Sequence, residues 1–287
     1  MYFYIFDPGK EKESKYFDRV SGRLLNLLSE HHIEGDHYRT TAIRTVELLT
    51  EQAVSGEAKT LVVVGSDASL SRAINTVIRK KADLTLGFVP LDPESVIGGI
   101  LGIPGDIEAA VRIIAGRLIV PVNLGRLGEF YFLTKVDLGE SPLRKLEAGL
   151  WGLKSISGLT RLQPFVVKIS LEDSFTASSE VLAAQIINSR DNTGCHMRLG
   201  DPTDELLDVV LLNKLSRGQI FRYRKELASG CLDNVPGVTV MHAKKIDILG
   251  PRKLPLSIEG QIYTKAPATI TVAGEKIKLI VGKARQF

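Results

Sequence analysis

The chain has 287 residues, of which 44% are hydrophobic and 24% charged, and its formal net charge is +4 with an isoelectric point near 8.9. This composition is ordinary for a folded globular protein and excludes a disordered or collagen-like chain, and no run approaches the ~18 apolar residues of a membrane span. At roughly 100–200 residues per domain, the length favours two domains that need no disulfides for stability.

Four short apolar runs in residues 1–130 predict strands. Tyr2–Phe6 is apolar and aromatic and ends in Asp-Pro, which indicates a first strand and its turn. Leu61–Val64 lacks polar alternation, which is typical of a strand buried on both faces of a parallel sheet. Leu86–Val89 and Leu118–Val122 predict two further strands.

Apolar residues at helical spacing separate these runs. They predict helices over 17–28, 43–53, 70–78 and 107–114. Asp106 is suited to cap the last of these helices, and Gly116 to close it. Repeated β-α units of this kind predict a parallel sheet with helices on both faces.

Beyond residue 130 the pattern changes to short apolar runs punctuated by turns, which predicts mostly antiparallel β structure. One helix is expected at about Ser216–Ala228, with Gly230 as its stop. The runs are Phe165–Ile169, Leu182–Ile187, Val209–Leu212, Val238–Met241, Lys245–Leu249 and Ala268–Val272.

The N-terminus lacks the basic region and long apolar run of a signal peptide, so we expect a soluble, cytoplasmic protein. Cys195 and Cys231 lie far apart and are expected to be reduced, each acting as a small buried hydrophobe. The Lys and Arg residues are scattered, which favours at most a weak attraction to anionic membranes and gives nucleic-acid binding no motif. The five histidines lack metal-ligand spacing, so no zinc site is expected.

The segment Gly65-Ser66-Asp67-Ala68-Ser69 follows a predicted strand and opens a predicted helix. Free N–H groups and the partial positive charge of a helix N-terminus suit a phosphate here. A purely structural role is also open, in which Ser69 caps the helix and Asp67 satisfies the turn.

Five further segments give this turn its context, and together they resemble the diacylglycerol kinase catalytic-domain family of lipid kinases. That family reads G-G-D-G-T at the turn and continues with P-x-G-T-G-N-D, L-G-I-P, P-V-D-L-G, D-G-L-L-D-V-V and D-G-E. The corresponding segments here are Leu86–Val96, Leu101–Pro104, Ile119–Gly125, Asp204–Val210 and Ser257–Gly260. The resemblance extends from Tyr2 to Val281, nearly the whole chain.

The resemblance implies a two-domain architecture like that of NAD kinases and diacylglycerol kinases. Residues 1–130 would form a Rossmann-like parallel-sheet domain that binds the nucleotide, and 131–274 an antiparallel β-sandwich that binds the lipid. The end of the chain, about 275–287, would return to the first domain.

The resemblance also implies a reaction, the transfer of the ATP γ-phosphate to a lipid hydroxyl. Glu259 would be the general base, and Asp204 with the Leu206 carbonyl would bind a structural Mg²⁺. Asp67 would be the nucleotide and metal aspartate, within a nucleotide-binding set of Gly65, Ser66, Asp67, Ala68, Ser69 and Asp92. A lipid alcohol or phospholipid and peripheral membrane contact are the implied partners.

The chain departs from the family at positions that the family uses for nucleotide binding and catalysis. Ser66 and Ala68 add Cβ atoms where glycine permits positive φ or close approach of a phosphate. G-T-G-N-D has become Asp92-Pro93-Glu94-Ser95-Val96, and one like-charge pair at ~4 Å costs up to ~4 kcal/mol at an effective dielectric near 20. Family aspartates are replaced by Asn123 and Ser257, and a glycine by Glu205.

Three hypotheses therefore stay open. The protein is an active or weakly active lipid kinase, or a non-catalytic relative that binds lipid, nucleotide or a protein partner. A NAD kinase or phosphofructokinase is a third hypothesis, but the later segments fit those enzymes poorly. The pattern leaves the lipid and the oligomeric state undetermined.

Overall fold

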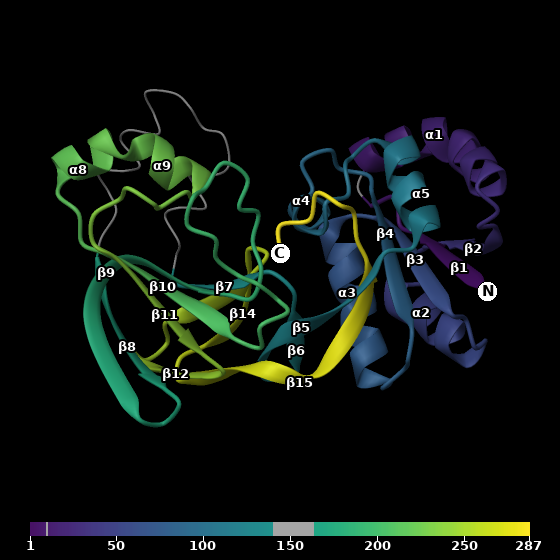
Figure 1. Ribbon diagram of the computed structural model, residues 1–287. Helices are drawn as coiled ribbons and strands as arrows, with labels where there is room; N and C mark the ends of the chain where they lie inside the picture. The colour runs from purple at the N-terminus through teal and green to yellow at the C-terminus, as the bar shows by residue number, and fades with distance from the viewer. Residues whose placement is uncertain (10, 140–163) are drawn as a thin grey trace. The chain divides into compact units, whose positions relative to one another are not determined.

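The computed structural model describes residues 1–9, 11–139 and 164–287, which form two compact units. Unit 1 consists of Met1–Leu124 and Gly274–Phe287, and unit 2 of Gly125–Ala273. Unit 1 combines a parallel sheet with helices, and unit 2 is built mainly of antiparallel strands (Figure 1). The predicted fold class is confirmed.

The sheet of unit 1 has the strand order β2-β1-β3-β4, and its strands are parallel. The end of β15 adds to its edge, with Lys278 and Leu279 parallel to Thr85 and Leu86, and β5 pairs with β15. All residues of β3 and β4 are buried, as their apolar runs predict. The strands are β1 (Tyr2–Phe6), β2 (Gly35–Arg39), β3 (Thr60–Gly65), β4 (Thr85–Pro90), β5 (Ile119–Leu127) and β15 (Ala268–Ile280).

Helices cover both faces of this sheet, with α1 and α5 on one face and α2 and α3 on the other (Figure 1). As predicted, Asp106 caps α5 by accepting the N–H of Ala109. Gly116, the predicted stop, is the last residue of the helix, and Arg117 in a left-handed conformation is its C-cap instead. The helices are α1 (Glu11–Glu30), α2 (Val46–Ser55), α3 (Asp67–Arg79), α4 (Val96–Leu101) and α5 (Ile107–Gly116).

Two further features of unit 1, the start of α2 and strand β2, differ from the sequence prediction. Helix α2 begins at Val46 rather than near Ile43, because the Thr45 side chain caps it and accepts the N–H of Leu48. Ile43 is left 83% exposed. Strand β2 was missed because it is a largely exposed strand at the sheet edge, without an apolar run.

Unit 2 is antiparallel, and its longest element is β9, which has different neighbours along its length. Phe175–Val181 pairs with β8, while the second half of β9 pairs with β7 and β10. A register shift at Leu212 and Asn213 of β10 accommodates the change. The strands are β6 (Phe130–Phe132), β7 (Lys135–Leu138), β8 (Phe165–Leu171), β9 (Phe175–Ile187), β10 (Leu207–Asn213), β11 (Val238–Ala243), β12 (Lys245–Gly250), β13 (Pro255–Ile258) and β14 (Gln261–Lys265).

Unit 2 contains two buried apolar clusters. The first gathers side chains from most of its strands, including Val136, Ile186 and Val209. The second joins side chains of β9 and β10 to helices α8 (Arg217–Arg222) and α9 (Arg224–Ser229). The sequence predicted a single helix over Ser216–Ala228. The structure has two short helices there, with a break at Tyr223.

The two cysteines form a disulfide, so the expectation of reduced thiols was wrong. Cys195 lies in the segment after β9 and Cys231 in the segment after α9, with their Cα atoms 5.1 Å apart. A sequence separation of 36 residues gave no sign that the two side chains meet.

No helix in the described part of the chain is both long enough and apolar enough to cross a membrane.

Gly125 tests the packing where β5 meets β6. A Cβ atom at this position would lie 2.0 Å from the buried ring of Phe132, its partner in register. We expect Gly125→Ala to lower the free energy of unfolding by about 1–3 kcal/mol, measured by urea denaturation. Gly22→Ala is the control, because nothing lies within 4 Å of a Cβ on exposed Gly22 of α1, and it should stabilise by about 0.5–1 kcal/mol. Equal stability of Gly125→Ala and the unsubstituted protein would contradict this packing.

Candidate active site

The carboxyl ends of the three strands β1, β2 and β3 bring polar residues to one edge of the unit 1 sheet. Asp7 follows β1, Thr40 follows β2 and Ser66 follows β3. Ligands of open α/β sheets bind outside this edge. The turn that the sequence singled out therefore lies where a ligand site is expected.

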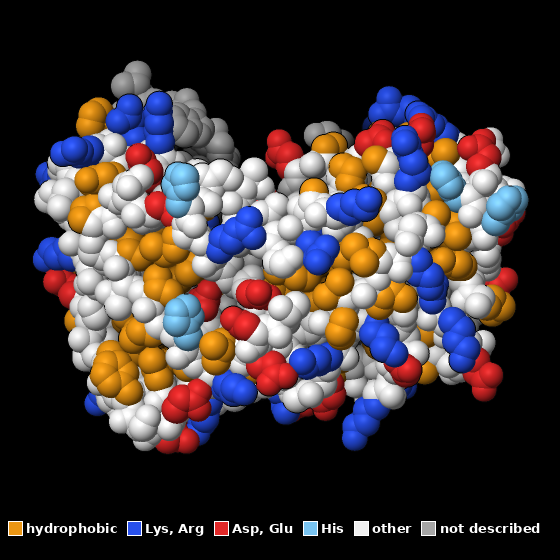
Figure 2. Space-filling model, viewed as in Figure 1, with side chains coloured by type: hydrophobic (Ala, Val, Ile, Leu, Met, Phe, Trp, Pro, Cys, Tyr) orange, Lys and Arg blue, Asp and Glu red, His pale blue; other side chains and the backbone are white. Residues whose placement is uncertain are grey.

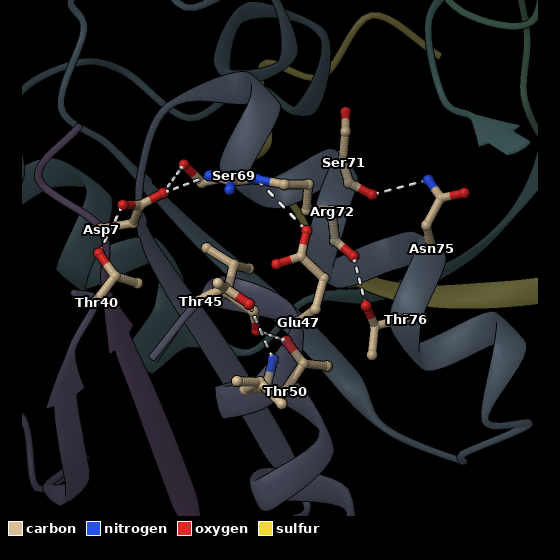
Figure 3. Close-up of polar contacts among 12 residues, drawn as sticks. Asp7, Thr40, Thr45, Glu47, Thr50, Ser69, Ser71, Arg72, Asn75 and Thr76 are labelled. Carbon is tan, nitrogen blue, oxygen red and sulfur yellow. Dashed lines mark hydrogen bonds and ion pairs between the residues drawn. The ribbon is translucent and has the colours of Figure 1, made fainter. Parts of the chain in front are cut away.

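Asp7 is the centre of the polar network at this edge (Figure 3). Its Oδ1 accepts the hydroxyl of Thr40 at 2.7 Å. Its Oδ2 accepts the hydroxyl of Ser69 at 2.6 Å and Nη2 of Arg72 at 2.8 Å. The buried carboxylate thus ties the ends of β1 and β2 to the first turns of α3.

Arg72 adds a cation to this edge. Besides Asp7, its guanidinium faces Glu47 of α2, with 4.0 Å between Nε and Oε1 (Figure 3). The Arg72 side chain is 44% exposed, so part of it remains open to solvent. Neither Asp7 nor Arg72 is among the predicted site residues, and the Asp7-Pro8 pair indicated only a turn after the first strand. The available signal was an acid directly after a buried strand.

The turn Gly65–Ser69 is closed by side-chain capping of α3. Ser66 accepts the N–H of Ser69 at 3.3 Å, and the Ser69 hydroxyl lies 2.9 Å from that of Ser66. Ser66 has φ −90°, and Ala68 lies within the helix. Their Cβ atoms therefore cause no left-handed strain, which removes positive φ as a reason for glycine here. Hindered approach of a phosphate stays a prediction.

Asp67 is turned toward the next helix. Its Oδ2 accepts the N–H groups of Val96 at 2.9 Å and Ile97 at 3.2 Å, and its Oδ1 accepts the Ser95 hydroxyl. Burial raises the pKa of Asp67 above its usual range, and the charge of Asp92 adds to the effect. Asp67 thus holds the start of α4 and also lies beside a second acid.

The segment after β4 keeps its acids in solvent. Asp92 and Glu94 are exposed, and Oδ1 of Asp92 accepts the N–H of Glu94 at 3.0 Å. The negative charge expected from the sequence is therefore present, and in part it acts on Asp67.

Asp204 lies in an acidic turn before β10. Its Oδ1 accepts the N–H of Leu206 at 2.8 Å. Its pKa is raised, mainly by burial and further by the charges of Asp201 and Asp208. Asp208 is held by the Gly200 N–H at 2.7 Å and by Nδ1 of His242 at 2.6 Å.

Hard oxygen donors of this kind suit magnesium, but the acids around Asp204 do not converge on one point. Among the described residues, only Cys195, Cys231 and Asp233 bring three potential ligand atoms within 4.8 Å of one another. Both of these sulfurs belong to the disulfide.

Glu259 is exposed in the turn between β13 and β14, with φ 48°. Burial raises the pKa of nearby Tyr263, and the charge of Glu259 adds to the effect. Tyr263 lies against Phe130, with 4.1 Å between the ring centroids. The proposed base thus stands at an open turn beside aromatic side chains.

A buried acid lies directly opposite the position where the family's aspartate is missing. Ser257 of β13 pairs in register with Asp137 of β7, and both are buried. Asp137 accepts Nε2 of Gln185 at 2.7 Å, and Nζ of Lys135 lies 3.9 Å away. Asp137 is not among the predicted site residues. Its only signal in the sequence was that one acid lies between Val136 and Leu138. The other replaced acid, Asn123, is buried in β5.

Comparisons with known proteins match both parts of the chain. Residues 6–127 match the family described as diacylglycerol kinase catalytic domain. Residues 140–281 match the family described as YegS C-terminal NAD kinase beta sandwich-like domain.

Curated relatives and solved structures agree with these matches. The chain is 23% identical over 292 residues to a diacylglycerol kinase of Staphylococcus epidermidis, covering 97% of this chain and 91% of the relative. For a diacylglycerol kinase of Staphylococcus carnosus the identity is 21%, with 97% and 94% covered.

A crystal structure of a putative diacylglycerol kinase from Bacillus anthracis superposes with a TM-score of 0.78 at 17% identity, covering 99% of this chain and 97% of that one. An NAD kinase from Archaeoglobus fulgidus in complex with ATP gives a TM-score of 0.59 at 10% identity, covering 99% and 95%. At these identities the superpositions establish the fold.

The raised pKa of Asp67 predicts a pH-dependent stability difference between the unsubstituted protein and Asp67→Asn. The folded state holds the Asp67 proton more tightly than the unfolded state, so this contribution is present at low pH and is lost as pH rises through the ordinary carboxyl range to the raised pKa. Asparagine can still accept the N–H groups but does not titrate. Urea unfolding at a series of pH values should therefore show the free energy of unfolding of Asp67→Asn rising relative to that of the unsubstituted protein as the pH rises from the ordinary carboxyl range, about pH 4.

A stability difference that stays constant over this pH range would contradict the assigned protonation behaviour. Asp67→Ala is the companion variant, because it leaves the N–H groups of Val96 and Ile97 without their acceptor. It should cost about 1–3 kcal/mol at low pH, and the cost should shrink as the pH rises, because alanine does not titrate either.

Proposed function

Because the chain belongs to the diacylglycerol kinase catalytic-domain family, we propose that it transfers the γ-phosphate of ATP to a lipid hydroxyl, slowly because its phosphate-binding segments are altered. The observation that carries the proposal is a pair of acids in unit 2, one on β7 and the other in the turn that follows β13, the strand paired with β7. Glu259 keeps the position of the general base at an exposed turn, and Asp137 supplies a buried carboxylate opposite Ser257.

ATP binding is proposed for the turn Gly65–Ser69 and the N-terminus of α3. The helix dipole favours an anion there, and Arg72 adds a partly exposed cation at the same sheet edge. The described ATP complex of the Archaeoglobus fulgidus NAD kinase, a neighbour in fold, supports ATP as the nucleotide.

Magnesium is proposed to accompany the nucleotide. The carboxylates of Asp67 and Asp92 are suitable oxygen ligands, and the charge of Asp92 acts on Asp67, a repulsion that a cation would relieve. Asp204 and the Leu206 carbonyl are kept as proposed ligands of a separate, structural Mg²⁺ in unit 2. When bound, the ion that accompanies the nucleotide neutralises charge on the transferring phosphoryl group.

The chain's own residues would divide the remaining work. Glu259 would accept the proton of the lipid hydroxyl as that oxygen attacks the γ-phosphorus, while the bond from the γ-phosphorus to the β–γ bridging oxygen breaks and ADP leaves. Asp137 would act as a positioning residue by fixing the polar surroundings of Ser257 at the base of the Glu259 turn. The substrate class is a lipid alcohol or phospholipid at a membrane surface, and ATP use fits a cytoplasmic location.

A second function, binding of lipid or nucleotide without transfer, is favoured by one specific observation. Asp67 is engaged with the start of α4. The segment between β4 and α4 exposes Asp92 and Glu94 where the family has glycines and an asparagine. Titration of ATP with and without magnesium, beside a lipid phosphorylation assay, separates the two functions. Magnesium-dependent binding with no transfer to any lipid alcohol would support the second.

Glu259→Gln tests the proposed base. Because the amide cannot accept the proton, we expect transfer of labelled γ-phosphate to a lipid alcohol to fall by about 10²–10⁴ in kcat. Glu57→Gln is a matched control, since Glu57 is also an exposed turn glutamate with positive φ, 53°. Undiminished turnover in Glu259→Gln would remove this assignment.

An exchange of side chains between paired strands tests Asp137. We expect Asp137→Ser to lower kcat about tenfold, and Ser257→Asp added to it to restore most of the activity, because the carboxylate then occupies the family position. Ser257→Asp alone should destabilise the protein, because like charges lie directly opposite one another. A merely structural role for Asp137 predicts no recovery of kcat and no change in its pH profile.

A further inference from the structure

The outer face of α8 and α9 differs from the rest of unit 2 in its side chains. The inner face of the two helices is buried, with Ile220 and Leu227 in the second apolar cluster. The outer face carries Phe221, which is 55% exposed. This ring does not contribute to either core of unit 2.

Four cations surround this ring in sequence: Arg217, Arg222, Arg224 and Lys225. Among the residues that the structure describes, none of the four forms an ion pair with a carboxylate, whereas Lys214 just before α8 is paired with Glu180. Figure 2 shows Lys and Arg side chains gathered over the region of α8 and α9, with apolar surface beside them. Within the described part of the chain, the charge of these four side chains is therefore not neutralised by a carboxylate.

Arg224 is held directly against Phe221. Its guanidinium carbon lies 4.7 Å from the centroid of the ring, and its Nη1 donates to the Phe221 carbonyl at 2.9 Å. Arg222 lies in the same way 5.6 Å from the ring of Tyr223. Cations and aromatic rings are thus fixed side by side on two short helices whose other face is anchored in the core.

This combination fits the surface of an anionic membrane. An exposed aromatic ring is favoured at the boundary between head groups and acyl chains, and arginine and lysine beside it attract anionic head groups. An acidic protein or a nucleic acid would bind the cations, but neither would account for the exposed ring of Phe221.

We propose that this outer face, which we call the α8–α9 face, docks the protein on anionic lipid bilayers. Phe221 enters the head-group boundary, while Arg217, Arg222 and Lys225 contact the lipid phosphates. The proposal rests on the proposed function only in naming lipid as the partner, because docking itself requires no ATP.

Vesicle co-sedimentation without nucleotide tests the docking. We expect binding to vesicles of equal parts phosphatidylcholine and phosphatidylglycerol, weak binding to phosphatidylcholine alone, and loss of binding as salt rises. Arg217→Glu, Arg222→Glu and Lys225→Glu together should weaken binding at least tenfold, and Phe221→Ser alone about fivefold.

The matched control changes the net charge equally at three exposed lysines of unit 1, Lys59→Glu, Lys81→Glu and Lys283→Glu. It should bind vesicles nearly as the unsubstituted protein does. In Phe221→Trp, the emission maximum of the introduced tryptophan should shift to shorter wavelength on anionic vesicles. Circular dichroism and urea unfolding establish that each variant is folded.

Several outcomes would overturn the proposal: no binding of the unsubstituted protein, equal loss in the control, or no effect of the α8–α9 substitutions. Preferential binding to RNA or to an acidic protein through the same residues would also overturn it. The proposed function fails separately, if no phosphate reaches lipid presented in detergent micelles while vesicle docking persists.

Discussion

The carboxylate of Asp7 is the interaction on which the candidate site of unit 1 depends. A buried charge is costly unless it is paired and hydrogen-bonded, and Asp7 has both kinds of partner in Thr40, Ser69 and Arg72. These contacts set the distance between the ends of β1 and β2 and the first turns of α3. The turn before α3 therefore takes its shape from an acid that lies far away in the sequence.

The same requirement explains how the other acids are placed. Asp67 is partly buried and is satisfied by the start of α4, so the acid carried over from the family motif also stabilises the fold. In unit 2 the family's aspartate is replaced by Ser257, while Asp137 lies opposite it on the neighbouring strand. The chain has thus kept acids near its proposed working positions.

The two apolar clusters of unit 2 separate its structural and its exposed surfaces. The first cluster holds the strands that carry Ser257 and Asp137, and the second anchors one face of α8 and α9. Because the helices are anchored from one side, their other side carries Phe221 and cations that form no ion pair among the described residues, without loss of packing. A Cys195–Cys231 disulfide joins the segments that follow β9 and α9 and so restrains the same region. The proposed base Glu259 and the proposed membrane-docking face would then belong to one unit.

Local patterns in the sequence determined the fold class, strands β1, β3 and β4 of the parallel sheet, the Asp106 cap and the family. They could do so because apolar runs, capping side chains and motif order are properties of neighbouring residues. Only the tertiary structure decided the partners of Asp7, the pairing of Asp137 with Ser257 and the union of the two cysteines. It also decided that Asp67 turns toward α4 and that the predicted helix over 216–228 breaks at Tyr223. These contacts join residues distant in sequence, and sheet register and chain path, which bring them together, depend on the packing of the whole unit rather than on any local pattern.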